Sequence, residues 1–363
     1  MSETVKELLF QNGKPIEEYF FFVESCPLCD SKRLKTLFRQ WGIGYYRCRE
    51  CEFVFSNPRL TNKGAYRWYN SDYYNAAMQT EHYIAENYSK YYSISLGEYY
   101  FKKTMQFFEG KDFPHDIIIA DLGCGSGAIL QYLKDELGFG YVKGFDLNTA
   151  NIEFAKRFRG LEVENKDIYD LVEKEKFDVV ITTENIEHVS QPIDYIKQIK
   201  KLVKPGGHLL LTTPHNDKKA TNLMGLSGDH FCAPNHQNYF NYQNLYTLIE
   251  SHGFKVIDYR INNQTQFNLY AFLKRSFISR DQATAFPPIK VSLKTIWKWQ
   301  RNRDKSVITS SYNNISLDQI DSGISNHLEN VSLKKRIKKF MSSIIPLYFR
   351  THQILLAKYN REN

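Results

Sequence analysis

Between residues 115 and 275 the chain alternates short runs of β-branched and aliphatic residues with segments of helical apolar periodicity. The runs predict buried strands, and the periodic segments predict helices that pack on them. Seven strands are expected in this region, the last of them within residues 265–275. Strands that alternate with helices in this way are typical of an α/β fold with a doubly wound, mostly parallel sheet.

The first strand ends in a glycine-rich turn that reads DLGCGSG, from Asp121 to Gly127. Gly123, Gly125 and Gly127 allow a sharp bend and a close approach of a ligand to the following helix. The turn also satisfies the dinucleotide pattern GxGxx(G/A), so an NAD-type site is an alternative. Asp121 favours a different ligand, because its carboxylate would repel a pyrophosphate but attract the ammonium of an amino-acid group.

Acidic residues follow the next strands at their carboxyl ends, where ligands bind in such sheets. Asp146 lies nineteen residues after Gly127, a position from which a carboxylate can accept both hydroxyls of a ribose. Asp167 follows in the sequence NKDI, and the buried run 177–183 leads into the sequence ENIEHV. These acids predict a ligand site along one edge of the sheet.

Four of the six cysteines form two CxxC pairs near the N-terminus: Cys26, Cys29, Cys48 and Cys51. Two such pairs, 18 residues apart, can place four thiolates tetrahedrally around Zn²⁺. A closed set of four thiolates leaves no open position for chemistry, so the predicted zinc is structural. Four unliganded cysteines are the alternative.

The chain contains an ordered set of motifs: DLGCGSG, GFD, NKDI, ENIEHV and KPGGHLLLTTP. With this set the chain resembles the class I S-adenosylmethionine-dependent methyltransferases. The CPLC…CREC…SNP segment is similar to that of bacterial sugar and natural-product methyltransferases with an N-terminal zinc-binding segment. The resemblance implies S-adenosylmethionine as cofactor and a strand order 3, 2, 1, 4, 5, 7, 6 with strand 7 antiparallel. It assigns the following residues to the cofactor: Asp121, Gly123, Gly125 and Gly127 around the methionine part, Asp146 at the ribose, Asp167 and Ile168 at the adenine, and in addition Leu147 and Glu184.

The sequence ExxEH after the fourth strand supplies Glu184, Glu187 and His188. It resembles two metal-assisted groups, the ubiquinone-pathway O-methyltransferases and the small-RNA 2′-O-methyltransferases. In the second group a further histidine, just before the helix after strand 5, completes the site. His236 lies at that place. We therefore expect these four residues to hold Mg²⁺ or another divalent cation that lowers the pKa of an acceptor hydroxyl. Two alternatives are His188 or His236 as a metal-free general base, and glutamates that merely cap a helix.

The net charge of +8 belongs to the C-terminal part of the chain, because residues 271–363 contain 17 Lys and Arg against 6 Asp and Glu. The remaining residues have a small acidic excess, which argues against a nucleic-acid partner. Residues 331–349 form a basic amphipathic pattern, which fits either an anionic membrane surface or packing on the protein. With no long apolar run, we expect a cytoplasmic protein with peripheral contact to the inner face of the membrane as one option.

The predicted organisation is a zinc ribbon (1–60), a tyrosine-rich helical cap (61–112), the methyltransferase domain (113–275) and a basic, partly helical extension (276–363). The expected reaction is methylation of a hydroxyl on a carbohydrate or similar small polar acceptor, with a nucleotide-linked or lipid-linked glycan included. Alternatives are sugar C-methylation, RNA 2′-O-methylation and a non-catalytic cofactor-binding module. The insertion 214–241, with His215 and His230, is expected to form one acceptor wall.

Overall fold

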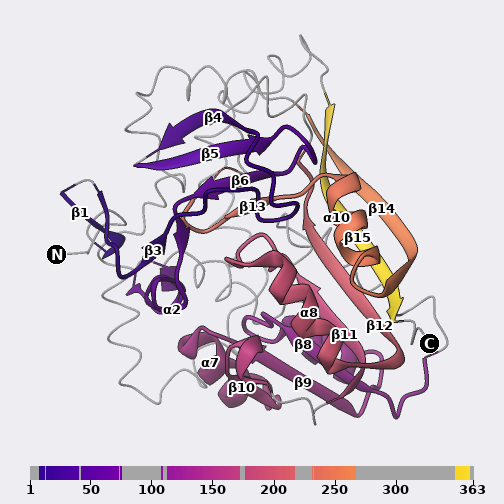
Figure 1. Cartoon of the computed structure of the whole chain (residues 1–363). Coiled ribbons are helices and arrows are strands. Elements are labelled where there is room, and N and C mark those ends of the chain that lie inside the picture. The colour runs from indigo at the N-terminus through magenta and orange to yellow at the C-terminus, as the bar shows by residue number, and fades with distance from the viewer. Residues whose placement is uncertain are drawn as a thin grey trace, which may run out of the picture.

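The structure is a computed structural model that describes residues 8–12, 14–40, 42–72, 74–75, 108, 113–171, 176–216, 231, 233–266 and 348–359. Its centre is a seven-stranded sheet with the order β10-β9-β8-β11-β12-β15-β14 (Figure 1). The strands are β8 (Ile118–Leu122), β9 (Tyr141–Asp146), β10 (Val163–Asn165), β11 (Phe177–Thr183), β12 (Val203–Pro214), β14 (Phe254–Gln266) and β15 (Tyr348–Tyr359). This confirms the predicted fold class and the strand order 3, 2, 1, 4, 5, 7, 6.

One strand of the sheet comes from a different part of the chain than the sequence pattern indicated. The seventh strand is β15, which pairs antiparallel with β12 on one side and β14 on the other. In Figure 1 it is the yellow arrow between these two strands. The prediction of a last strand at 265–275 is therefore wrong: residues 265 and 266 end β14, and 267–275 lie outside the described residues.

This strand also corrects the boundary that was expected at residue 275. Residues 348–359, assigned to a C-terminal extension, supply the buried side chains of Ile354, Leu355, Leu356 and Ala357 to the core of the sheet. Most of the predicted amphipathic segment 331–349 lies outside the described residues, so membrane contact stays a prediction. Within the described part of the chain, no helix is long and apolar enough to cross a membrane.

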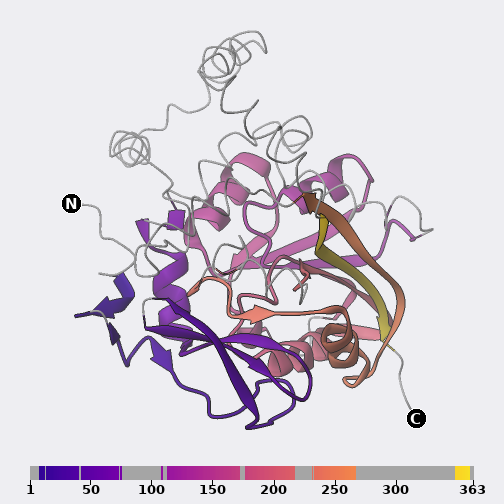
Figure 2. The ribbon, with the colours of Figure 1, turned by 90° about the horizontal axis from the view of Figure 1, so that it is seen from above.

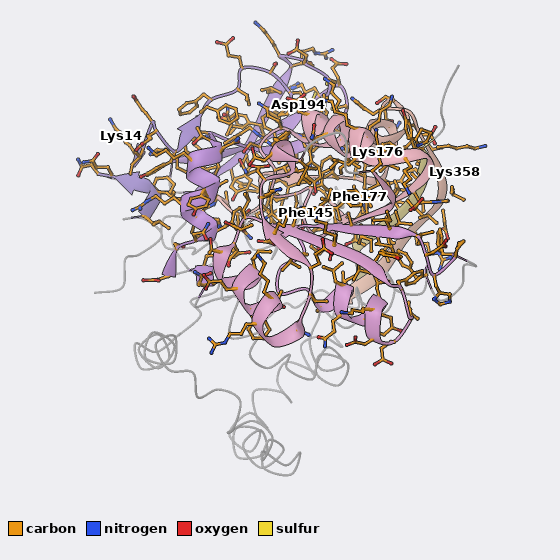
Figure 3. All side chains as sticks on the ribbon, turned by 90° about the horizontal axis from the view of Figure 1, so that it is seen from below. Lys14, Phe145, Lys176, Phe177, Asp194 and Lys358 are labelled. Carbon is orange, nitrogen blue, oxygen red and sulfur yellow. The ribbon has the colours of Figure 1, made fainter. Side chains whose placement is uncertain are left out.

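Two apolar layers cover the sheet, because alternate residues of each strand point to opposite faces. On one face Ile119, Val179 and Leu210 pack with the helices α6 (Ala128–Asp135) and α7 (Thr149–Arg159). On the other face Leu122, Val180 and Leu211 pack with α8 (Pro192–Leu202) and α10 (Tyr242–Glu250). Phe145 and Phe177, whose ring centroids are 6.2 Å apart, lie in the second layer, whereas Lys14 and Lys358 lie at the periphery (Figure 3).

The cysteine segment, which contains the two CxxC pairs within residues 1–60, packs against this second layer. It also forms a four-stranded sheet with one strand from a later part of the chain. Its strands β4 (Leu34–Gln40), β5 (Ile43–Cys48) and β6 (Val54–Asn57) continue into β13 (Asn238–Tyr239), giving the order β13-β6-β5-β4. Figure 2 shows orange β13 running beside the indigo strands. Shorter strands are β1 (Phe10–Gln11), β2 (Lys14–Pro15), β3 (Phe20–Phe21) and β7 (Arg59–Leu60). The cysteine segment is thus joined to residues 238–239 by the backbone pairing of β6 with β13.

The tyrosine-rich region begins with α2 (Asn62–Tyr69), which is capped by the side chain of Thr61. The end of this helix lies over the carboxyl end of β9. Asn70 donates to the carbonyl of Leu147 at 3.0 Å and accepts from the amide of Thr149 at 3.0 Å, while Asn148 donates to Asn75 at 2.6 Å. The start of the predicted cap therefore contacts the expected ribose side of the sheet, and residues 76–107 lie outside the described part.

Candidate active site

The glycine turn follows β8 directly and is held against the end of β9. The amides of Gly123 and Cys124 donate to the carbonyl of Phe145 at 2.8 and 3.1 Å. Gly123 has φ +76°, and a Cβ there would lie 2.5 Å from the side-chain nitrogen of Asn185. Both the positive φ and this close approach require glycine. The turn thus lies beside the segment that follows β11.

Asp121 and Asp146 lie on neighbouring strands at this turn. The carboxylate of Asp146 accepts hydrogen bonds from the amides of Gly125 at 2.8 Å and Asn148 at 2.7 Å. Asp121 is 1% exposed, and its Oδ1 accepts no hydrogen bond from the described residues. Burial, with the nearby charge of Asp146, raises the pKa of Asp121 to about 8. An unpaired buried carboxylate is costly, so Asp121 suits a cationic ligand group.

The predicted adenine residues begin the 3₁₀ turn η2 (Ile168–Asp170) after β10. Asp167 caps this turn, because its side chain accepts a hydrogen bond from the amide of Tyr169 at 3.2 Å. Ile168 is buried, and burial raises the pKa of Asp167. Both residues therefore lie near the same edge of the sheet as Asp146, with which Asn165 is paired in register.

Glu187, His188 and His236 offer ligand atoms that all lie within 4.8 Å of one another. Glu187 and His188 belong to a tight turn after β11, in which the amide of His188 donates to the carbonyl of Asn185 at 2.9 Å. His236 comes from the segment before β13, and its ring centroid is 4.7 Å from that of His188. The structure thus brings together three of the four residues expected to bind a cation.

Glu184 is not a member of this cluster. It has φ +48°, and its Oε1 accepts a hydrogen bond from the hydroxyl of Thr212 at 2.9 Å. Thr213, the next residue, donates instead to Oε2 of Glu187 at 2.8 Å. The two glutamates are therefore held by adjacent threonines of β12.

The hydrogen bonds of His188 define its tautomer. Its Nδ1 lies 3.0 Å from the carbonyl of Asn235, and a carbonyl can only accept, so Nδ1 carries the proton and Nε2 bears a lone pair. This Nε2 lies 3.7 Å from Oε1 of Glu187. Burial lowers the pKa of His188 to about 4, so the ring is neutral at physiological pH.

The facing oxygen of Glu187 is buried and accepts no hydrogen bond from the described residues. Burial, followed by the charge of Glu184, raises the pKa of Glu187 well above its ordinary value. A carboxylate oxygen and an imidazole lone pair repel each other unless a proton or a cation lies between them. The cluster is therefore suited to a divalent cation, for which carboxylate and neutral imidazole are ordinary ligands.

The four cysteines also converge. Their Sγ atoms lie within 4.8 Å of one another, with 3.6 Å between Cys26 and Cys51 and 3.5 Å between Cys29 and Cys48. A tetrahedral zinc with Zn–S bonds of about 2.3 Å requires sulfur atoms about 3.8 Å apart. The hydrogen bond from Cys51 lowers the pKa of Cys26 to about 6, which favours one thiolate in the cluster. The spacing therefore fits zinc.

The family comparison agrees with the sheet order. Residues 92–259 match the family described as a methyltransferase domain. This chain contains a class I S-adenosylmethionine-dependent methyltransferase domain. S-adenosylmethionine is the cofactor of this fold, and the buried carboxylate of Asp121 fits its ammonium group.

Two curated relatives of the methyltransferase domain are ubiquinone biosynthesis O-methyltransferases. That of Colwellia psychrerythraea is 30% identical over 164 residues, which cover 41% of this chain and 65% of that protein. That of Haemophilus ducreyi is 34% identical over 123 residues, which cover 31% of this chain and 51% of that protein. The chain thus spans less than two thirds of the length of these relatives.

Among solved structures, an S-adenosylmethionine-dependent methyltransferase from Mesorhizobium loti is similar at 14% sequence identity and a TM-score of 0.38. The match covers 70% of this chain and 97% of that one.

Several residues around the cluster are not marked by any pattern in the sequence. Thr213 follows an apolar run in which it reads as part of a strand, and Asn235, Gln237 and Asn238 belong to a polar sequence of no known role. Arg59 follows the cysteine pairs in the sequence SNPRL, 131 residues before its hydrogen-bond partner Ser190. A polar run between aromatic residues, NHQN, is the one feature that could have drawn attention to this segment. The remaining contacts depend on the fold. Of the histidines of the insertion, His215 contacts Gln353 at 3.4 Å, whereas His230 lies outside the described residues.

Proposed function

We propose that this protein transfers the methyl group of S-adenosylmethionine to a hydroxyl oxygen of a small acceptor, with Glu187, His188 and His236 as ligands of a divalent cation. The observation that carries this proposal is the buried Oε1 of Glu187. It has no hydrogen-bond partner among the described residues, and it faces the lone pair of His188 Nε2 at 3.7 Å. Three ligands at this spacing leave further coordination positions open for an acceptor.

On the donor side, Asp121 binds the ammonium of the methionine part and Asp146 the ribose. The unpaired Oδ1 of Asp121 supports the binding of the ammonium. The position of Asp146 at the end of β9 supports the binding of the ribose. Asp146 keeps two lone-pair positions beyond those used by the amides of Gly125 and Asn148. Asp167 and Ile168 are proposed to contact the adenine, and their position directly after β10, beside β9, supports this role.

The acceptor must lose a proton during methylation of a hydroxyl. A bound divalent cation would lower the pKa of that hydroxyl. His188 alone is a poor alternative as general base, because a histidine whose pKa is about 4 takes up a proton only weakly at neutral pH. This low pKa favours a ligand role for His188 over the metal-free version of the reaction.

The acceptor class proposed first is a carbohydrate or a similar polar hydroxyl compound, free or attached to a nucleotide or lipid. It rests on the sequence resemblance to sugar methyltransferases that carry a CxxC…CxxC segment. The names of the curated relatives favour a second class, a ring hydroxyl of a ubiquinone-like compound. Both classes present a hydroxyl whose proton a cation can help to remove, so the same site would serve either one.

The four cysteines are proposed to hold a structural Zn²⁺. Their spacing and the burial of Cys26 and Cys48 support this role, and a short segment of this kind gains much of its folding free energy from its metal. Because β6 of the segment pairs with β13, which follows His236 by two residues, the zinc would also stabilise one wall of the candidate site.

The test is methyl transfer from labelled S-adenosylmethionine to a panel of nucleotide sugars, glycans and catechols, with product mass as the readout. We expect a product that is heavier than its acceptor by one labelled methyl group in place of a hydrogen, with the label on oxygen, formed with added Mg²⁺ or Mn²⁺ and lost after extensive chelation. Activity that survives chelation would overturn the cation role. A product methylated on carbon would overturn the hydroxyl acceptor.

A further inference from the structure

Arg59 is a buried cation that forms no ion pair with a carboxylate among the described residues. It is 0% exposed, and burial lowers its pKa to about 9, so it stays protonated at neutral pH. Its hydrogen bonds go to carbonyl and amide oxygens. A buried guanidinium is costly unless its donors are satisfied, so these contacts fix its position.

Four of the five oxygens that it contacts come from the two segments that carry the histidines of the cluster, and the fifth is the carbonyl of Ser56. Arg59 Nη2 donates to the carbonyl of Val189 at 3.2 Å, and Nη1 donates to the carbonyl of Gln237 at 3.2 Å. Val189 follows His188 in the chain, and Gln237 follows His236. One guanidinium therefore bridges the peptide groups next to both histidines.

Two further contacts extend this bridge. Arg59 Nε donates to the carbonyl of Ser190 at 2.8 Å, and Nη2 donates to Oδ1 of Asn238 at 2.6 Å. Asn238 in turn donates to the carbonyl of Val189 at 2.7 Å. The amide of Gln237 donates to the carbonyl of Glu187 at 2.7 Å. The two segments are thus connected directly as well as through Arg59.

We propose that Arg59, which belongs to the cysteine segment, is a positioning residue of the cation site. It sets the spacing between His188 and His236 by holding the segments that carry them. This inference rests on the proposed function of the cluster. Without the guanidinium, the carbonyl of Ser190 loses the donor at 2.8 Å, while Val189 keeps only the donor from Asn238 and Gln237 only that from the backbone amide of Ser56. The two segments are then held less firmly, and we expect them to shift. Mutation of the residues that orient metal ligands commonly lowers metal affinity by about 10- to 100-fold.

The chemistry of the side chain explains why arginine is required. Five N–H donors in a planar fork can reach oxygens on several segments at once, whereas the ammonium of lysine donates from a single atom. Arg59→Lys therefore keeps the charge but loses the bridge. Arg59→Met removes both.

The experiment measures Mn²⁺ affinity by electron paramagnetic resonance and S-adenosylhomocysteine affinity by calorimetry in the full chain. Arg59→Lys and Arg59→Met are compared with Arg67→Lys and Arg67→Met. Arg67 belongs to the same segment and donates to the carbonyl of Leu8 at 3.0 Å, a contact away from both histidine segments. We expect Mn²⁺ affinity to fall at least about tenfold in the Arg59 variants. The cofactor affinity of all variants and the Mn²⁺ affinity of the Arg67 variants should stay within about twofold of the wild type.

The outcomes separate this inference from the proposed function. If the wild-type protein binds no Mn²⁺, the cation site itself is wrong. If it binds Mn²⁺ through Glu187 and Arg59→Lys binds equally well, the positioning role is overturned while the site stands. Parallel loss of cofactor and Mn²⁺ binding in both Arg59 variants would also overturn the inference, because Arg59 would then support the whole fold rather than the spacing of the histidines.

Discussion

Oε1 of Glu187 lies 3.7 Å from Nε2 of His188, and no described residue donates a hydrogen bond to that oxygen. The Nδ1 proton of His188 is already directed at the carbonyl of Asn235, so Nε2 cannot donate to the carboxylate while the ring is neutral. A divalent cation between these two atoms would remove the repulsion between the carboxylate oxygen and the imidazole lone pair.

Adjacent threonines provide a matched pair of variants. Thr213→Val removes the hydrogen bond to Glu187 Oε2, and Thr212→Val removes the hydrogen bond to Glu184 Oε1. Because only Glu187 belongs to the cluster, we expect Thr213→Val to weaken Mn²⁺ binding about tenfold and Thr212→Val to leave it nearly unchanged. Equal effects of the two variants on the Mn²⁺ dissociation constant would contradict this assignment.

The affinity for S-adenosylmethionine should depend on pH through Asp121. Its pKa of about 8 in the free protein means that the carboxyl is largely protonated at pH 7. The ammonium of the cofactor favours the ionised form of Asp121, so binding releases a proton and affinity rises with pH up to about 8. At higher pH the affinity falls again, because an α-amino group loses its own proton at a pKa of about 8.

Calorimetry between pH 6 and 9 in buffers of different ionisation enthalpy measures this proton release. Asp121→Asn is the control, since it keeps the titration of the ligand itself and removes only that of the protein. We expect the variant to bind more weakly and to lack the rise. A wild-type pH profile identical in shape to that of Asp121→Asn would show that Asp121 does not face the ammonium.

The cysteine cluster predicts one tightly bound zinc per chain in protein purified without chelators, measurable by plasma mass spectrometry. Cys29→Ser should lower the zinc content and the midpoint of thermal unfolding, because one of four thiolates is lost. Ser31→Ala, in the same turn, should leave both unchanged. Zinc-free protein with the wild-type unfolding midpoint would contradict a structural metal.

The last strand of the sheet should be essential for stability. Leu355 is fully buried between β12 and β14, so Leu355→Ala should lower the free energy of unfolding by about 2–5 kcal/mol. Lys358→Ala, on the same strand but exposed, should change it by less than about 0.5 kcal/mol. Denaturant unfolding of the two variants measures the difference. A chain ended at Arg275 lacks this strand, and we expect it to be insoluble or unable to bind the cofactor.

Local patterns were sufficient to predict the parallel half of the sheet and the edge at which the ligand residues lie. The strands β8, β9, β11 and β12 pack against apolar layers on both faces of the sheet. Their sequences therefore contain short apolar runs, which can be recognised without knowledge of the fold. The glycine turn and the acids at strand ends follow them directly. The convergence of Glu187 and His188 with His236 was predicted through the resemblance of the sequence ExxEH to metal-assisted methyltransferases, in which a further histidine completes the site.

The strand β15 was not predictable in the same way. Residues 265–275 and 353–357 are both apolar, and an antiparallel strand inserted between two others is chosen by long-range pairing that no local window contains. The basic segment 331–339 before it further suggested a surface extension.

Arg59 was missed for a similar reason. Its partners lie 130 and 178 residues away along the chain, and an arginine is ordinarily exposed, so nothing in the sequence indicates its burial.

The most direct test of the central claim is the titration of the metal-free protein with Mn²⁺, followed by electron paramagnetic resonance, in the wild type, Glu187→Gln and Glu184→Gln. We predict one site per chain in the wild type, loss of that site in Glu187→Gln, and retention within a few-fold in Glu184→Gln. A wild-type protein that binds no Mn²⁺, or a Glu187→Gln variant that binds it as well as the wild type, would contradict the proposed cation site.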